Sequence, residues 1–183
     1  MFKQLLKKVA LELDRRNIPY MVIGGQAVLL YGEPRLTRDI DITLGITTEK
    51  LDQLLEMIEA IQLKSLVDPH DFTLRTMVLP CESLENHILV DFIFSFSPYE
   101  RQAMERVRSV EIEGVNVKFA SVEDLVIHKV FAGRARDIED VKSVLIKNPK
   151  MDLPYIRHWL NELSTATGES FTDRFEDVLK EAR

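Results

Sequence analysis

The sequence is short of cysteine and of long hydrophobic runs, and each shortage excludes a class of protein. A single cysteine, Cys81, rules out an internal disulfide framework and a zinc cluster built from cysteines. The apolar run that begins at Tyr20 is short, and the run from Ile88 to Phe96 is interrupted by Asp91. Because a bilayer span needs roughly 20 apolar residues, we expect no membrane-spanning helix.

Basic charge is also scarce, since the formal net charge of the 183 residues is −6. That balance disfavours a protein that coats nucleic acid nonspecifically, although small basic clusters, such as Arg35 with Arg38, leave room for a local basic groove. The N-terminal residues lack the apolar core of a secretory signal and have the pattern of an amphipathic helix, which predicts a cytoplasmic protein. The length suits one domain, or a core with a small appendage.

Hydrophobic spacing predicts a mixed α/β region followed by a mostly helical one. Strands are predicted at 20–23, 39–44, 72–79 and 87–94, with a hairpin of 107–112 and 115–119. Helices are predicted at 3–16, 26–31 and 47–61, from Ser121 onward, twice within 136–166, and near 171–182.

Gly24 and Gly25 form the junction between a predicted strand and a predicted short helix. Backbone N–H groups at such a junction can bind phosphate oxygens, helped by the positive end of the helix. Two glycines in a turn are commonplace, so this feature alone is weak evidence of a phosphate site and an ordinary turn is the alternative.

Asp39 and Asp41 flank Ile40 in a predicted strand. Successive strand side chains alternate faces, so the two carboxylates share one face while Ile40 points into the core. Carboxylate pairs of this kind suit Mg²⁺, which combines one or two carboxylates with waters and substrate phosphates. The alternative is a strand that simply turns acidic side chains toward solvent.

Asp91 stands alone in the apolar run from Leu89 to Phe94. A charge there is costly unless it is paired, hydrogen-bonded or metal-bound, although an edge position would also tolerate it. A third carboxylate beside Asp39 and Asp41 would supply what a two-metal phosphoryl-transfer site requires.

The order of these features resembles the polymerase-β-like nucleotidyltransferase superfamily over about residues 18 to 96. The shared order is Gly-Gly, a short helix, a loop with Arg and Thr, Asp-x-Asp, and a later strand Asp. The resemblance implies a mixed β-sheet flanked by helices, with a small C-terminal helical region. It also implies a nucleoside triphosphate site with Mg²⁺ or Mn²⁺, and the residues implied are Asp39, Asp41 and Asp91 for metal and catalysis and Gly24, Gly25, Thr37 and Arg38 for the nucleotide.

Residues 119 to 145 are similar to the region that follows the catalytic domain in bacterial nucleotidyltransferases resembling abortive-infection (type IV) toxins. On that resemblance Lys129, Asp137 and Asp140 complete the nucleotide site, with a catalytic core at 1–120 and a helical region at 121–183. A lysine can offer a point charge to phosphates, and two aspartates three apart share a helix face. The alternative for these residues is a helix cap and a surface salt bridge.

The expected reaction moves a nucleoside monophosphate from the triphosphate to an acceptor hydroxyl, with release of pyrophosphate. The toxin resemblance suggests RNA such as tRNA, or a protein, as acceptor, and an antitoxin as partner. Antibiotic adenylylation of the aminoglycoside type is the enzymatic alternative, and a catalytically weak nucleotide-binding or partner-binding module is the other. His128 and Trp159 are expected to be structural.

Overall fold

The computed structural model describes residues 1–95 and 97–182, which form one seven-stranded mixed sheet in the order β3-β4-β5-β2-β1-β7-β6. Strand β1 runs parallel to β7 and β2 runs parallel to β5, while the other neighbours are antiparallel. The strands are β1 (Tyr20–Ile23), β2 (Asp39–Leu44), β3 (Leu63–Ser65), β4 (Val78–Ser83), β5 (Leu89–Phe94), β6 (Arg108–Ile112) and β7 (Val115–Phe119).

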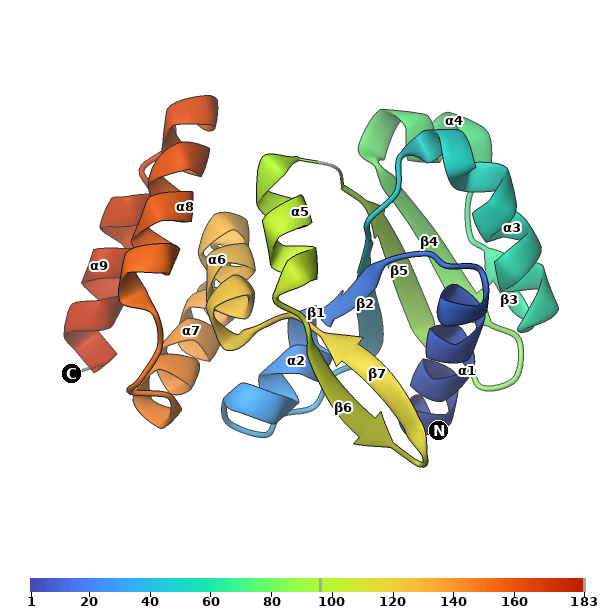
Figure 1. Ribbon diagram of the computed structural model, residues 1–183, viewed down its shortest axis with the longest axis horizontal. Helices are drawn as coiled ribbons and strands as arrows, with labels where there is room; N and C mark the ends of the chain where they lie inside the picture. Colours follow the sequence, from blue (N-terminus) through green and yellow to red (C-terminus); the bar gives the residue numbers. More distant parts are fainter. Residues whose placement is uncertain (96, 183) are drawn as a thin grey trace.

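Helices flank the sheet, and the last four gather on one side of it (Figure 1). In Figure 1 the C-terminal helices α6 to α9 lie at the left, and α3 and α4 lie at the right beside β3 and β4. The helices are α1 (Phe2–Arg15), α2 (Gly24–Tyr31), α3 (Leu51–Ala60), α4 (Pro69–Thr76), α5 (Pro98–Glu105), α6 (Val122–Ala132), α7 (Ala135–Lys147), α8 (Leu153–Thr167) and α9 (Phe171–Ala182), with a 3₁₀ turn, η1 (Thr48–Lys50), before α3.

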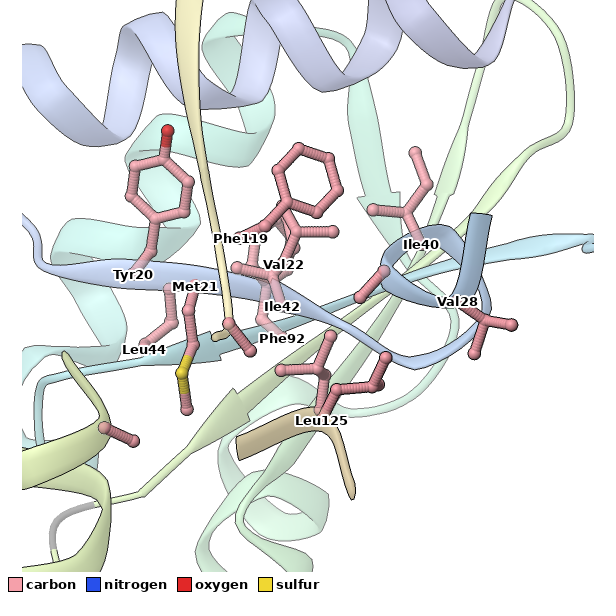
Figure 2. Packing of buried hydrophobic residues seen from close by; sticks show 14 of the residues in the cluster. Tyr20, Met21, Val22, Val28, Ile40, Ile42, Leu44, Phe92, Phe119 and Leu125 are labelled. Atoms are coloured by element: carbon pink, nitrogen blue, oxygen red, sulfur yellow. The ribbon is translucent and has the colours of Figure 1, made fainter. Parts of the chain in front are cut away.

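Much of the core lies on the face of the central strands away from the aspartates, and Figure 2 shows its packing. Ile40, Ile42 and Phe92 are completely buried, and Val22 and Phe119 join them from β1 and β7. Each fully buried aliphatic or aromatic side chain contributes roughly 1.5–3 kcal/mol relative to an exposed one. These strands therefore form a rigid base on which the opposite face can carry polar groups.

The predicted alternation of β2 is confirmed, since Asp39 and Asp41 are partly exposed and Ile40 and Ile42 are buried. The strand's neighbour β5 is parallel to it, and the register places Asp41 directly beside Asp91. Because adjacent strands lie about 4.8 Å apart, the topology brings residues 50 positions apart in the chain into one row.

The predicted strand at 72–79 is wrong, because most of that segment belongs to helix α4. Asp68 caps this helix by accepting a hydrogen bond from the Asp71 backbone N–H, and Pro69 occupies its first turn, which favours a helix start. Met77 ends it in the left-handed conformation, with φ of 60°. Strand β4 follows, one residue after the helix cap.

Three further differences concern short elements. Strand β3 and helix α5 were not predicted, although Ser97 and Glu100 form a capping box at the start of α5. The helix predicted from Thr47 begins as the turn η1, and the Thr47 side chain makes no cap hydrogen bond. Ser121 does cap α6, accepting from the Asp124 backbone N–H.

The predicted fold class, a mixed sheet flanked by helices with a helical C-terminal region, is confirmed. Within residues 1–95 and 97–182, none of the helices combines the length and the apolar character that crossing a membrane requires.

Candidate active site

A cleft of about 660 Å³ opens where β2 and β5 meet helices α6 and α7. It brings together residues from four separate parts of the chain. Its lining is Gly24, Gly25, Arg35, Leu36, Thr37, Arg38, Asp39, Asp41, Asp91, Lys129, Arg134, Arg136 and Asp137. Nine of the ten residues predicted for the site line this one cleft; the exception is Asp140.

Three carboxylates form the floor of the cleft, two from β2 and one from β5. Burial first, and then repulsion from Asp39 and Asp91, together raise the pKa of Asp41 to about 6 against the pull of Lys129. The pKa of Asp91 is also raised, by burial and by Asp39. Carboxylates that repel one another in a partly dry site store electrostatic energy that a bound cation would release.

Gly24 begins α2 and allows the Asp41 carboxylate to approach the helix backbone. Its φ of +61° lies in the left-handed region, and a Cβ there would collide with the Asp41 side chain. A Cβ on Gly25 would lie 2.9 Å from the Thr37 Cβ. The two glycines therefore let the carboxylate and the loop threonine pack directly on the first turn of α2, where backbone N–H groups are free of helix partners.

Thr37 fixes the loop that precedes the carboxylates. Its hydroxyl accepts a hydrogen bond from Gln26 Nε2 at 3.1 Å and donates to the Asp39 backbone carbonyl at 3.1 Å. These two hydrogen bonds tie the loop to α2 and to the start of β2. Gln26 was not foreseen, because a polar residue inside a short helix carries no sequence signal for a partner eleven positions away.

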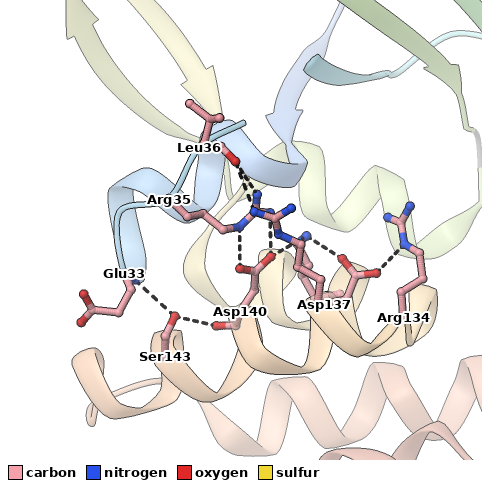
Figure 3. Close-up of polar contacts among 9 residues, drawn as sticks. Glu33, Arg35, Leu36, Arg134, Asp137, Asp140 and Ser143 are labelled. Carbon is pink, nitrogen blue, oxygen red and sulfur yellow. Dashed lines mark hydrogen bonds and ion pairs between the residues drawn. The ribbon is translucent and has the colours of Figure 1, made fainter. Parts of the chain in front are cut away.

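Lys129 is the centre of a buried ion network that forms the wall of the cleft. Figure 3 shows its two partners on α7, Asp137 and Asp140. The Lys129 Nζ lies 2.6 Å from Asp137 Oδ1 and 2.9 Å from Asp140 Oδ2, and its side chain is only 8% exposed. Arg134 Nε donates to the other oxygen of Asp137 at 2.7 Å. Because all three side chains are held by several bonds, the ammonium position is fixed before any ligand arrives.

Asp140 extends the network to the loop between α2 and β2. Arg35 donates two hydrogen bonds to the Asp140 carboxylate, from Nε to Oδ1 at 2.7 Å and from Nη2 to Oδ2 at 2.8 Å. Arg35 and Arg136 both also donate to the Leu36 backbone carbonyl. This loop is therefore tied to α7, and Asp140 lies behind the cleft wall rather than in its lining.

The two aspartates of α7 behave oppositely to those of the sheet. Burial by itself would raise the pKa of Asp137, but hydrogen bonds from Lys129 and Arg134 outweigh it and lower the pKa. The pKa of Asp140 is lowered in the same way, against burial, by Arg35 and Lys129. Both side chains are thus held as carboxylates.

A comparison of this sequence with known protein families agrees with the site described above. A family described as nucleotidyltransferases of unknown function (DUF6036) matches residues 1–180, nearly the whole chain. The chain belongs to this family. Among curated proteins, none matches this nucleotidyltransferase.

Solved structures share the fold of this nucleotidyltransferase at low identity. The antibiotic-resistance factor ANT(2'')-Ia in solution is 18% identical with a TM-score of 0.63, and the match covers 90% of this chain and 93% of that one. An antigenic nucleotidyltransferase-like protein from Paracoccidioides brasiliensis is also 18% identical, with a TM-score of 0.58 over 97% and 91%. The lincosamide adenylyltransferase LnuA, solved with lincomycin, is 18% identical with a TM-score of 0.50 over 72% and 89%.

The nucleotidyltransferase also has cleft residues that were not assigned to the site from sequence. Arg134 and Arg136 line the cleft and are largely exposed. The basic run that contains them was visible, but only the fold shows that it faces the carboxylates. Arg38, which was predicted, is exposed and makes no hydrogen bond or ion pair within the described residues.

The carboxylate floor does not by itself form a metal cage. In the described part of the chain, no group of three or more His, Cys, Asp or Glu side chains is placed to hold a metal ion alone. Mg²⁺ does not need such a cage, because it usually combines one or two carboxylates with waters and substrate phosphates. Hard oxygen donors with a raised pKa, at Asp41 and Asp91, fit a divalent cation whose remaining ligands come from water or from a bound phosphate.

Proposed function

We propose that this nucleotidyltransferase binds a nucleoside triphosphate with Mg²⁺ or Mn²⁺ in the 660 Å³ cleft and transfers the nucleoside monophosphate to an acceptor hydroxyl. The observation that carries the proposal is the division of the cleft into an acidic floor and a basic wall. Asp39, Asp41 and Asp91 form the floor, and Lys129 and Arg38 belong to the basic side.

Charge balance supports a triphosphate accompanied by metal. Five basic and four acidic side chains line the cleft, and two of the basic ones already bind Asp137. A ligand with several negative charges would be repelled by the aspartate floor unless cations came with it. The guanidinium of Arg38, which makes no hydrogen bond or ion pair within the described residues, is suited to bind the phosphates. The backbone N–H groups in the first turn of α2 are suited to the same role.

The metal would be held by Asp39, Asp41 and Asp91, and when bound it would supply charge neutralisation for the phosphates and a lower pKa for the acceptor hydroxyl. Lys129 would offer a fixed positive charge to the phosphates, in a position set by Asp137 and Asp140. Gly24 and Gly25 would contribute backbone N–H groups. Asp140, which is outside the lining, acts in this proposal only as a positioning residue.

The reaction balances as one substitution at the α-phosphorus. The acceptor oxygen forms a bond to the α-phosphorus, and the bond from that phosphorus to the oxygen bridging the β-phosphate breaks. Pyrophosphate leaves with the bonding electron pair, and the hydroxyl proton passes to Asp91, whose pKa is raised by burial and by Asp39. Positioning and electrostatics supply most of the catalysis in such transfers.

The proposed acceptor is a small molecule, and RNA such as tRNA or a protein side chain is the alternative. The small-molecule proposal draws on the folds of ANT(2'')-Ia and LnuA, which act on antibiotics. The abortive-infection subtype and an antitoxin partner rest on the sequence resemblance alone and stay predictions. The role of residues 121–183 in completing the nucleotide site also stays a prediction.

The test is transfer of α-³²P label from each of the four nucleoside triphosphates, with Mg²⁺, into a cell extract. Wild type is compared with Asp39→Asn/Asp41→Asn and with the matched control Asp177→Asn, whose side chain is 74% exposed and forms its ion pair within the described residues with the exposed Lys180. Label is expected with wild type and the control and not with the double variant. Equal labelling by all three would contradict the role of the floor, and a folded protein that binds no triphosphate by calorimetry would contradict the function.

A further inference from the structure

A second cavity of about 490 Å³ lies on the same face of the sheet as the carboxylates. Its walls come from the ends of β1, β2 and β5 and from helices α5, α6 and α8. We define the apolar cavity by its main apolar residues, Ile23, Met77, Ile93, Ile127, Phe131 and Leu163. Its volume falls within the range of small-ligand sites.

The strand register places this cavity next to the row that Asp41 and Asp91 form across β2 and β5. Thr43 lies two residues after Asp41 on β2, and Ile93 lies two residues after Asp91 on β5. Residues two apart on a strand share a face and lie about 6.6 Å apart. The basic loop that contains Arg38 precedes Asp39, so the apolar cavity adjoins the floor from the opposite end.

Two polar atoms in the wall of the apolar cavity have no partner. Thr43 Oγ1 and His128 Nε2 are buried and make no hydrogen bond within residues 1–95 and 97–182. Thr43 is only 1% exposed. A buried polar atom without a partner costs about 1–3 kcal/mol, so two of them beside one cavity indicate hydrogen-bonding positions for a ligand.

The apolar cavity carries little charge. No Lys or Arg of the described residues lines it, and its one carboxylate, Glu100, accepts hydrogen bonds from Ser97. Burial lowers the pKa of His128, which keeps the imidazole neutral. A polycation or a phosphate chain would therefore find no partners here, whereas an apolar body with one or two hydrogen-bonding groups would.

We propose that the apolar cavity binds the acceptor and that the acceptor is a small uncharged molecule with an apolar body and at least one hydroxyl. The inference rests on the proposed function, because it takes the hydroxyl to be the group that receives the nucleotide. Thr43 and His128 hydrogen-bond the acceptor, and its reacting hydroxyl reaches the row of Asp41 and Asp91. The bonds made and broken are those of the proposed transfer.

The first experiment titrates the intact protein with 4-phenyl-1-butanol and follows the methyl NMR signals of Ile127, with the exposed Ile146 as internal control. Fluorescence of Trp159 gives a second signal, because its ring lies 5.4 Å from that of Tyr99 in the cavity wall. Saturable shifts at Ile127 and Trp159, without shifts at Ile146, are expected. Shifts at Ile127 with kanamycin or a CCA-ended oligoribonucleotide instead of the alcohol would overturn the proposal.

Variants separate the cavity from the triphosphate site. Ile93→Phe/Leu163→Phe fills the cavity and is expected to weaken 4-phenyl-1-butanol binding at least tenfold, while Glu162→Phe, the exposed neighbour, is the matched control. Thr43→Val/His128→Phe keeps the volume and removes both unpartnered atoms, and binding is expected to weaken several-fold in a protein no less stable. Unchanged binding in both variants would overturn the assignment.

Triphosphate binding, measured by calorimetry on the same proteins, distinguishes the two proposals. If the alcohol binds and no triphosphate does, the proposed function fails and the cavity site stands. If label is transferred only into the RNA or protein fraction of an extract, the function stands and the acceptor class is overturned. Label in a small nucleotidylated product, in which a phosphodiester joins the uncharged acceptor to the nucleoside, is the expected result, and this label should be lost in the filled variant.

Discussion

Two groups of aspartates, one on the floor of the cleft and one in and behind its wall, have opposite electrostatic states. On the sheet, Asp41 has a pKa raised to about 6 by burial and by neighbouring carboxylates. On α7, Asp137 and Asp140 have lowered pKa values, because Lys129 and two arginines bind them. The comparison separates carboxylates that are held by ion pairs from carboxylates that repel one another.

The largest expected effect is at the centre of the satisfied group. Lys129→Met leaves two buried carboxylates with too little positive charge, and we expect it to lower the free energy of unfolding by about 3–5 kcal/mol. Urea unfolding measures the loss. Lys180→Met is the control, since its pair with Asp177 is largely exposed and worth little; equal losses in the two variants would mean that the network is not a buried one.

A smaller effect of opposite sign is expected on the sheet. Asp41→Asn removes the repelled charge. Since the pKa of Asp41 is raised from 3.8 to about 6 in the folded protein, the free energy of unfolding of the metal-free variant should be higher than that of wild type by about 2–3 kcal/mol at pH 7.5. The same variant should lose nucleotide transfer. A variant that is both inactive and less stable would show that Asp41 has a structural partner instead.

The pH dependence gives an independent measurement of the same group. The folded pKa of Asp41 is higher than its unfolded value of 3.8, so its favourable contribution is complete below about pH 4 and is lost as pH rises to about 6. Wild type should therefore lose stability relative to Asp41→Asn across this interval in EDTA. Added Mg²⁺ with triphosphate should reduce the difference, and an unchanged difference would argue against a cation on the floor.

The smallest effect is expected at the unpaired arginine. Arg38→Gln should leave the free energy of unfolding unchanged, because this side chain makes no hydrogen bond or ion pair among the described residues. Triphosphate affinity should fall roughly tenfold, the value of one charge-assisted hydrogen bond. Calorimetry with the variant and the wild type measures both, and an unchanged affinity would place the phosphates elsewhere.

Sequence patterns predicted the elements that carry strong periodicity, such as α1 and the β6–β7 hairpin. The error at 72–79 arose because a short apolar run does not distinguish strand from helix, and the Asp68-Pro69 start signal outweighed it. The capping box of Ser97 and Glu100 was visible in the sequence, and it would have predicted α5.

The site could be predicted in its residues but not in its connections. The glycines and the sheet aspartates form a recognisable order along the chain. Neither spacing nor composition could show that Arg35 binds Asp140, which lies 105 residues further along the chain, or that Gln26 donates a hydrogen bond to Thr37. Those contacts depend on how α7 and the loop pack, which is set by tertiary structure.

The Arg35–Asp140 pair has a consequence for the history of the family. A two-pronged bond between a guanidinium and a carboxylate tolerates few single replacements, because loss of Asp140 leaves the half-buried Arg35 without this ion pair and loss of Arg35 leaves the buried Asp140 with Lys129 alone. Asp140 also binds Lys129, so three positions should change together or stay together. In an alignment of relatives, residues 35, 129 and 140 are therefore expected to covary, in spite of lying on three different segments of the chain.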